Sequence, residues 1–307
     1  MKEKTILFFL KGVALLPLWI LYIFADFIYF VVYRIIGYRK KVVRENLLSS
    51  FPEKGEKEIK KIERGYYHFL ADVIVETVKL FHISDKQLRR RIKVNNYEAI
   101  NADLSDGKNV VLLLGHYGNW EWVQEISRYF IPEAYMGSIY HPLNNKTWDN
   151  IYLKLRSRWG THIVAQKQAV RTLLNRDHFP WVFGFIADAR PLTFTPRNCI
   201  EFLNHPTYFI YGPEEIGSKL GARFYYLEML PQRRGHYEIT FRPLVPSDSA
   251  KTEAERIQTS NDLPRSSAEE TYPVTREFWR EFGSTIQKAP SYWLWSHKRW
   301  KKPPTSD

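Results

Sequence analysis

The sequence predicts an α/β protein in which a mixed sheet is flanked by helices and preceded by an apolar N-terminal helix. Short runs of β-branched and aromatic residues alternate with longer segments whose apolar residues recur at helical spacing. With 307 residues, 44% of them hydrophobic, the chain can bury one substantial core. We therefore expect an anchoring segment over residues 1–38 and one main domain over residues 39–307.

The N-terminal segment from Thr5 to Tyr38 is almost entirely apolar and aromatic, interrupted by Lys11, Asp26 and Arg34. About 20 such residues are enough to cross a bilayer, so we predict one membrane helix. A cleavable signal peptide fits less well, because the apolar stretch is too long and no small-residue cleavage site follows it. A buried core helix is the other interpretation.

The charges around this segment bear on its orientation. Basic residues gather between Arg34 and Arg44, which favours a cytoplasmic main domain at the inner membrane. Lys2, Lys4 and Lys11 weaken that preference and allow the segment to lie in the membrane interface instead.

The remaining elements follow from periodicity and turn residues. A charged helix with an apolar stripe is expected from Lys57 to Leu80. Strands are expected at 110–114, 135–140, 161–164, 181–186, 222–228 and 237–242. Further helices are expected at 120–129, 147–159, 168–176, 213–220 and 274–288. The polar stretch 247–270 predicts a surface loop.

The most informative motif follows the strand at 110–114, a continuous apolar run typical of a strand buried on both faces. Gly115 and Gly118 allow a sharp turn that contains His116, and Asn119 can cap a helix that begins at Trp120. Glu121 would then lie in the first helical turn, where the helix dipole favours its ionised form.

This spacing suits a general base, His116, with an orienting carboxylate, Glu121. The structural alternative is a hydrogen-bonded surface histidine and a glutamate placed by the dipole alone. Arg156 and Arg158 follow a helical stripe that could direct a guanidinium group toward an oxyanion at this turn. An arginine at a helix C-terminus can equally serve only to complement the dipole.

The amino-acid composition limits the kinds of site and the binding partners that we expect. The single cysteine, Cys199, permits no internal disulfide, and the other histidines lack the compact spacing of a zinc site, so we expect no metal. The net charge of +12 suits nucleic acid or an anionic membrane surface. No nucleic-acid module is recognisable, whereas tryptophan and basic residues interleave over 293–301, as expected at a lipid headgroup layer.

Several motifs together resemble one family. They are His116-Tyr-Gly-Asn-Trp-Glu121, Val43-Arg-Glu-Asn-Leu47 with Ser50-Phe-Pro-Glu53, Tyr140-His-Pro142, Leu155-Arg-Ser-Arg158, Ala187-Asp188 and the closing Tyr292 to Lys301. In order and content they resemble the lipid A late acyltransferases, the lauroyl and myristoyl transferases of lipopolysaccharide synthesis. The resemblance covers nearly the whole chain.

The resemblance implies a glycerolipid-acyltransferase-like sandwich that moves a fatty acyl chain from acyl-carrier protein or acyl-CoA to a hydroxyl of a lipid A precursor, without a cofactor. It implies His116, Glu121 and Arg158 as catalytic residues. It also implies a substrate-binding set, which consists of Asn119, Tyr140, His141, Arg156 and Asp188.

Two alternatives remain open. His141 replaces the arginine usual in the family, which leaves phosphate recognition at that position in doubt and makes another glycolipid or an aminolipid an alternative acceptor. A non-enzymatic lipid-binding adaptor is the alternative of a different class.

Overall fold

A seven-stranded mixed sheet forms the centre of the protein in a computed structural model that describes residues 2–175, 177, 179–245 and 271–300. Its strands are β1 (Ile92–Asn95), β2 (Val110–Leu114), β3 (Tyr135–Tyr140), β4 (His162–Ala165), β5 (Trp181–Ile186), β8 (Arg223–Arg233) and β9 (His236–Pro243). They are ordered β1-β9-β8-β2-β5-β3-β4. The predicted fold class is therefore confirmed.

Strand β2 lies near the middle of the sheet and pairs in parallel with both β5 and β8. Its register sets Val110 beside Val182 of β5 and Leu114 beside Ile186. Parallel neighbours end at the same edge of a sheet, so the segments that follow β2 and β5 emerge side by side. The antiparallel β8–β9 pair makes the sheet mixed.

The core lies on both faces of the sheet. Along β2, Leu112 and Leu114 belong to one buried apolar cluster, whereas Val111 and Leu113 belong to the other. This alternation confirms that the 110–114 run is a strand buried on both faces.

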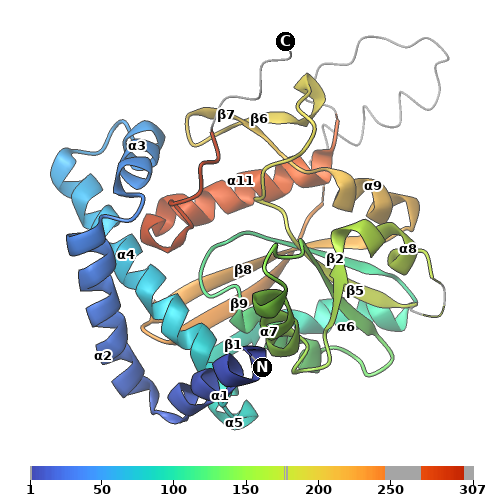
Figure 1. Ribbon diagram of the computed structural model, residues 1–307. Coiled ribbons are helices and arrows are strands. Elements are labelled where there is room, and N and C mark those ends of the chain that lie inside the picture. The colour runs from blue at the N-terminus through green and yellow to red at the C-terminus, as the bar shows by residue number, and fades with distance from the viewer. Residues whose placement is uncertain (1, 176, 178, 246–270, 301–307) are drawn as a thin grey trace.

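The helices flank this sheet (Figure 1). Their bounds are α1 (Lys2–Leu15), α2 (Leu18–Tyr29), α3 (Lys40–Ser50), α4 (Glu56–Lys79), α5 (Asp85–Arg89), α6 (Tyr97–Ser105), α7 (Lys146–Arg156), α8 (Ala169–Leu173), α9 (Gly212–Lys219) and α11 (Pro273–Lys288). The other elements are the π-helix η1 (Phe30–Ile36), the 3-10 helices η2 (Trp122–Tyr129), η3 (Gln166–Gln168), η5 (Pro196–Asn198) and η7 (Pro290–Tyr292), and the hairpin β6 (Cys199–Phe202) with β7 (His205–Tyr208). Figure 1 shows α2, α3 and α4 grouped at one side of the molecule.

All the predicted strands occur: β2, β3 and β5 have the predicted ends, and the ends of β4, β8 and β9 are shifted by one to five residues. The predicted helix over 57–80 is α4. The helix expected to begin at Trp120 is instead the 3-10 helix η2, which begins at Trp122. The sequence did not predict β1, α3, α5, α6 or the β6–β7 hairpin. The predicted loop over 247–270 lies outside the described residues.

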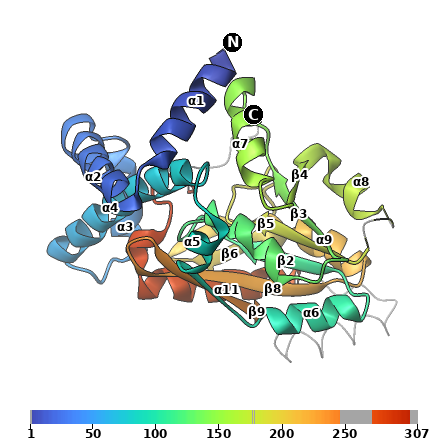
Figure 2. The ribbon, with the colours of Figure 1, turned by 90° about the horizontal axis from the view of Figure 1, so that it is seen from below.

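The expected single N-terminal helix is broken. Pro17 has no N–H to donate to the preceding turn, and α1 ends at Leu15 before α2 begins at Leu18. Together α2 and η1 form a helix, Leu18–Ile36, that is long and apolar enough to cross a membrane by length and composition. Figure 2 shows α1 projecting beside α7, where Glu3 and Lys154 form an ion pair of 2.7 Å.

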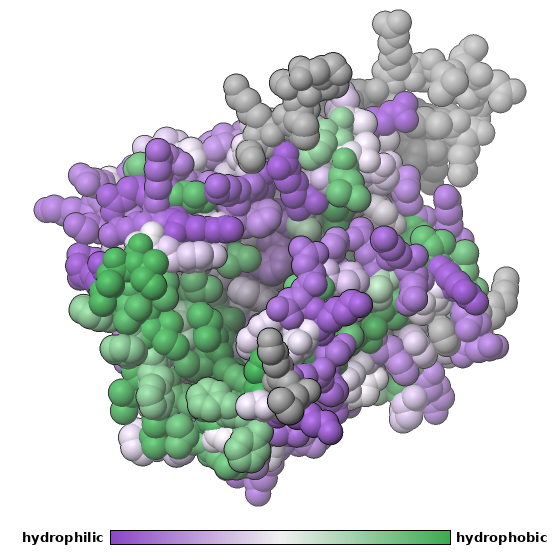
Figure 3. All heavy atoms as spheres, in the orientation of Figure 1, coloured by the Kyte–Doolittle hydropathy of each residue, from purple (hydrophilic) through white to green (hydrophobic). Residues whose placement is uncertain are grey.

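Helix α2 is packed against α4, and the two share one apolar cluster that contains Leu18, Leu21 and Ala25 of α2. The opposite face of α2 is exposed and apolar. Figure 3 shows the resulting hydrophobic surface over the N-terminal helices. The division of the chain at residue 38 stays a prediction.

Candidate active site

The turn after β2 is built on two glycines, as the sequence predicted. A side chain at Gly115 would collide with the Phe282 ring, because an added Cβ would lie 2.2 Å from its nearest atom. Gly118 has φ +62°, in the left-handed region that favours glycine. These two positions hold the backbone around His116 close to α11 and β8.

His116 forms a hydrogen bond with the carboxylate of Asp188, the second residue after β5. The Nδ1 to Oδ1 distance is 2.8 Å. An ionised carboxylate can only accept, so Nδ1 carries the proton in this bond and Nε2 is the ring nitrogen able to take another. The His116 side chain is 28% exposed, whereas Asp188 is fully buried. This is the arrangement of an oriented general base.

Asp188 has two further donors from the C-terminal segment. Trp293 Nε1 donates to Oδ2 at 2.9 Å, and Arg299 Nη2 donates to the same oxygen at 3.1 Å. Burial alone would raise the pKa of the Asp188 carboxyl, but the charges of His116 and Arg299, with these hydrogen bonds, hold it well below its usual range. Asp188 therefore stays ionised and can stabilise an imidazolium at His116.

The C-terminal segment also fixes the backbone of the turn. Leu294 N–H donates to the His116 carbonyl and Gly118 N–H donates to the Tyr292 carbonyl, each at 3.1 Å. Trp293 and Trp295 are almost completely buried. The expectation that the tryptophans of this stretch meet lipid headgroups is therefore wrong for these two, which pack inside the protein behind the site.

Glu121 is engaged by Arg156 rather than by the His116 ring. The Arg156 guanidinium at the end of α7 donates two hydrogen bonds to the Glu121 carboxylate, at 2.9 and 2.6 Å. Burial alone would lower the pKa of Arg156, but the Glu121 carboxylate outweighs it and raises this pKa. The sequence led us to expect Glu121 as the partner that orients His116, and in the structure Asp188 occupies that position.

The Arg158 guanidinium donates hydrogen bonds to backbone carbonyls at the C-terminal end of α4. Its two terminal nitrogens donate to the backbone carbonyls of Leu80 and Ile83, the latter at 2.6 Å. The guanidinium also lies over the Trp159 ring, with its central carbon 4.7 Å from the ring centroid. These contacts hold α7 against α4, and among the described residues no hydrogen bond joins Arg158 to the His116 turn.

The other expected substrate-binding residues lie at or after the carboxyl ends of β2 and β3, which are both parallel to β5. Asn119 is buried, and its side-chain oxygen accepts from Trp122 N–H at 3.2 Å, although the N-cap position of η2 is Glu121 rather than the predicted Asn119. Tyr140 donates to Asp149 at 3.4 Å. His141 is exposed, and its Nδ1 is bonded to the Pro142 carbonyl at 3.0 Å. Neither Tyr140 nor His141 is bonded to His116 in the described part of the chain.

A small apolar pocket adjoins the turn. It is lined mainly by side chains from the sheet and from the start of the 3-10 segment, among them Leu112, Leu114, Trp120, Met136, Ile186 and Leu227. Trp120 also packs edge-on against the His116 ring, with 5.3 Å between the ring centroids. The catalytic candidate thus borders a small apolar space of about 30 Å³.

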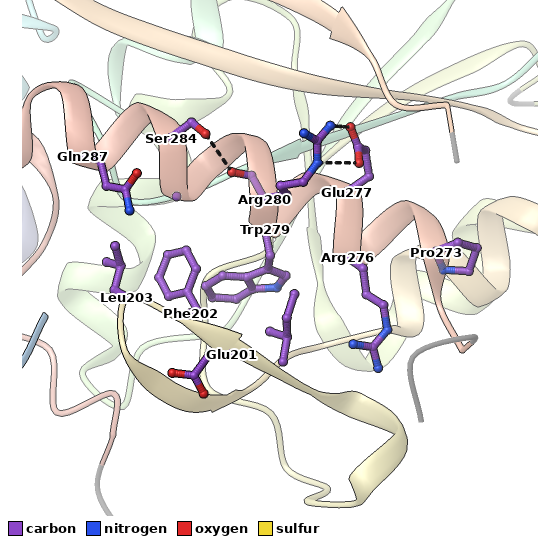
Figure 4. Close-up of a pocket in the computed structure, with 12 residues that line it drawn as sticks. Glu201, Phe202, Leu203, Pro273, Arg276, Glu277, Trp279, Arg280, Ser284 and Gln287 are labelled. Carbon is purple, nitrogen blue, oxygen red and sulfur yellow. Dashed lines mark hydrogen bonds and ion pairs between the residues drawn. The ribbon is translucent and has the colours of Figure 1, made fainter. Parts of the chain in front are cut away.

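A larger cavity of about 480 Å³ lies between the β6–β7 hairpin and α11 (Figure 4). Its two arginines are already engaged, because Arg276 donates to the Cys199 carbonyl and Arg280 pairs with Glu277. Its Phe202 wall packs on Trp293, which therefore lies between this cavity and Asp188. In the described ranges, no cluster of three His, Cys, Asp or Glu side chains is placed to bind a metal ion.

Sequence reasoning missed Trp293 and Arg299 as partners of Asp188. The closing motif contained a signal that could have identified them, because a buried indole N–H needs an acceptor and a buried arginine needs a carboxylate. It did not indicate which acid they would meet, since that depends on the pairing of β2 with β5.

The model of the family described as bacterial lipid A biosynthesis acyltransferase matches residues 5–302, nearly the whole chain. No curated protein matches the sequence.

Proposed function

Because this chain belongs to the bacterial lipid A biosynthesis acyltransferase family and is an enzyme of that type, we propose that it transfers a fatty acyl chain from an acyl thioester to a hydroxyl of a lipid A precursor with His116 as general base. The observation that carries this proposal is the 2.8 Å hydrogen bond between His116 and the buried, ionised Asp188. It fixes the ring in the tautomer that a base requires.

In the proposed reaction, His116 Nε2 removes the proton of the acceptor hydroxyl while the oxygen attacks the thioester carbonyl carbon. The tetrahedral oxyanion then collapses, the carbon–sulfur bond breaks, and the imidazolium returns its proton to the departing thiolate. Asp188 stabilises the imidazolium between the two proton transfers. Because the hydroxyl attacks directly, the mechanism needs no covalent acyl-enzyme.

The proposed substrates are supported by the residues around the His116 turn and by the charge of the chain. The acyl chain of a thioester carried by acyl-carrier protein or coenzyme A is proposed to pack against the apolar side chains beside Trp120, where the pocket of about 30 Å³ must widen to admit it. Arg156, held by Glu121 next to the same segment, is the proposed cation for the oxyanion or for a phosphate of the glycolipid. The net charge of +12 favours both an acidic carrier protein and an anionic lipid surface.

We also propose that the N-terminal helices hold the enzyme at the inner membrane, with the main domain on the cytoplasmic face. Trp19, Phe27 and Phe30 are at least half exposed on α2 and η1. Ion pairs also hold α2 to the rest of the protein. Arg234 pairs with Asp26 of α2 and with Asp72 of α4, each at 2.6 Å. A helix held to the protein by charged side chains suits a position in the membrane interface better than a position across the bilayer with lipid on all sides.

The test of the reaction uses purified enzyme with vesicles that contain a lipid A precursor. Acyl-carrier protein and coenzyme A thioesters are supplied separately, and mass spectrometry follows the product. We expect His116→Ala to lower turnover by about 10²–10⁴-fold, as loss of a general base does. Near-normal turnover of this variant would refute the mechanism, and activity in cells retained by a His116→Ala/Glu121→Ala double variant would favour a lipid-binding adaptor.

The test of the membrane surface compares two matched double variants. We expect Trp19→Glu/Phe27→Glu to weaken binding to anionic vesicles strongly, because two charges enter the exposed apolar face. Val170→Glu/Leu174→Glu, on and beside α8, changes similarly exposed apolar residues away from α2 and should bind normally. Equal binding by both variants would show that the membrane surface lies elsewhere.

A further inference from the structure

A buried glutamate joins the N-terminal helix to the active-site turn. Glu76 lies on α4 and is fully buried. Its carboxylate accepts three hydrogen bonds from three different parts of the chain. Tyr22 of α2 donates at 2.7 Å, Tyr237 of β9 donates at 2.6 Å, and Asn119 of the His116 turn donates at 2.6 Å.

Both the side chain and the backbone of Glu76 are linked to the His116 turn by hydrogen bonds. Asn119 uses its amide nitrogen on Glu76 and its amide oxygen on Trp122 N–H. The Trp122 indole in turn donates to the backbone carbonyl of Glu76 at 3.0 Å. Thus α4 contacts the start of the 3-10 segment through both the side chain and the main chain of Glu76.

All three donors to this carboxylate are neutral groups. Burial raises the pKa of Glu76 to about 7, although the three hydrogen bonds oppose the shift. A buried glutamate of this kind costs stability relative to an apolar residue, so a role in shaping the site is a physical reason for its presence.

We propose that Glu76 is a positioning residue of the acyl transfer, which fixes the His116 turn through Asn119 and ties that turn to the membrane-facing helix α2 through Tyr22. The proposal rests on the proposed function, because it assigns the effect to the rate of that reaction. Glu76 acts only through Asn119 and Trp122, so its loss should lower kcat while the KM for the acyl donor changes little.

The sharpest test reverses the polarity of the Glu76–Asn119 hydrogen bond. In Asn119→Asp two carboxylates face each other across 2.6 Å, whereas in Glu76→Gln the amide oxygen can still accept from Asn119 while the new N–H donates to the Tyr22 hydroxyl. In the double variant Glu76→Gln/Asn119→Asp, the new amide nitrogen donates to the new carboxylate, which still accepts from Trp122 N–H. We expect Asn119→Asp to lose about tenfold or more in kcat, Glu76→Gln to lose less, and the double variant to return to within about threefold of wild type.

Asn101→Asp is the matched control, because Asn101 likewise bridges two backbone groups, Tyr129 and Ile131, but does not touch Glu76. Its kcat should not change. Tyr22→Phe is a milder variant that removes one donor, and it should lower kcat severalfold at constant KM.

The outcomes separate this proposal from the proposed function. A folded wild type that transfers no acyl chain to the lipid A precursor would refute the function. An active wild type whose Asn119→Asp or Tyr22→Phe variant keeps a normal kcat would refute the positioning role. Recovery of the melting temperature without kcat in the double variant would also refute it, because it would show a structural role alone.

Discussion

Two buried carboxylates that the sequence analysis selected, Asp188 and Glu121, have different partners. Asp188 is shared among His116, Trp293 and Arg299. Glu121, which is nearly as buried, is occupied by both prongs of one guanidinium, that of Arg156. Asp188 is therefore placed to hold the histidine ring, and Glu121 to hold an arginine.

This difference shows how the fold orients the His116 ring. Glu121 is five residues from His116 in sequence, but Asp188, 72 residues away, makes the hydrogen bond. Parallel pairing of β2 with β5 brings the two strand ends together, whereas the turn at Gly118 takes the chain away into η2. Sheet topology, more than sequence spacing, selects the partner of the histidine.

Among the changes that test this difference between Asp188 and Glu121, Asp188→Asn should lower turnover most. It removes the charge that stabilises the imidazolium and permits the wrong tautomer, a loss of about 10⁴-fold in turnover in a Ser-His-Asp triad. We expect on the order of 10²–10⁴-fold here, measured as kcat in the vesicle assay. Glu121→Gln is the matched control and should lose less. A larger loss in Glu121→Gln than in Asp188→Asn would reverse the assignment and make Glu121 the orienting group.

Changes at Glu121 and its partner Arg156 should have intermediate effects. Arg156→Lys keeps the charge but loses the two-pronged geometry that Glu121 accepts. We expect a loss of about tenfold in kcat/KM for the acceptor, with a smaller change for the acyl donor. In a double-mutant cycle, Arg156→Lys and Glu121→Gln should be strongly non-additive, because they share two hydrogen bonds. Additive effects would mean that the pair does not work as a unit.

Sequence reasoning predicted the strand at 110–114, the glycine turn and His116, because continuous apolar runs and glycines act locally. The family resemblance also indicated Asp188, as a substrate-binding residue. Sequence reasoning did not predict the His116–Asp188 bond or the burial of Trp293 and Arg299, since these depend on which strands pair and on where the C-terminal segment packs. The break at Pro17 was visible in the sequence, but the continuous apolar composition outweighed it in our prediction.

Arg158 offers a contrast with Arg156 two residues away. The sequence predicted a donor to the oxyanion, whereas its hydrogen bonds to Leu80 and Ile83 support a role in holding α7 on α4. We expect Arg158→Lys to lower the melting temperature by roughly 2–4 °C, about 1 kcal/mol for a chain of this size, and to leave kcat within about twofold. Calorimetry and the vesicle assay measure the two effects. A strong loss of kcat at an unchanged melting temperature would restore the catalytic interpretation.

The smallest effect is expected at Glu125, a second glutamate on the same 3-10 segment, four residues beyond Glu121. It is buried, and neither of its oxygens has a hydrogen-bond partner among the described residues, although Arg89 lies 3.8 Å away. Burial raises its pKa from the ordinary 4.5 to about 7. The folded state therefore binds this proton more tightly than the unfolded state does, and the resulting stability is present below pH 4.5 and lost as the pH rises through about 7.

Glu125→Gln removes this dependence, because the amide is neutral at every pH. We expect the variant to melt at nearly the wild-type temperature at pH 5 and roughly 2–4 °C higher at pH 8, with normal turnover, since Glu125 holds no arginine in the way that Glu121 does. Thermal unfolding at the two pH values checks this. A loss of turnover, or the same difference in melting temperature at both pH values, would show that partner geometry is not what separates the two glutamates of this segment.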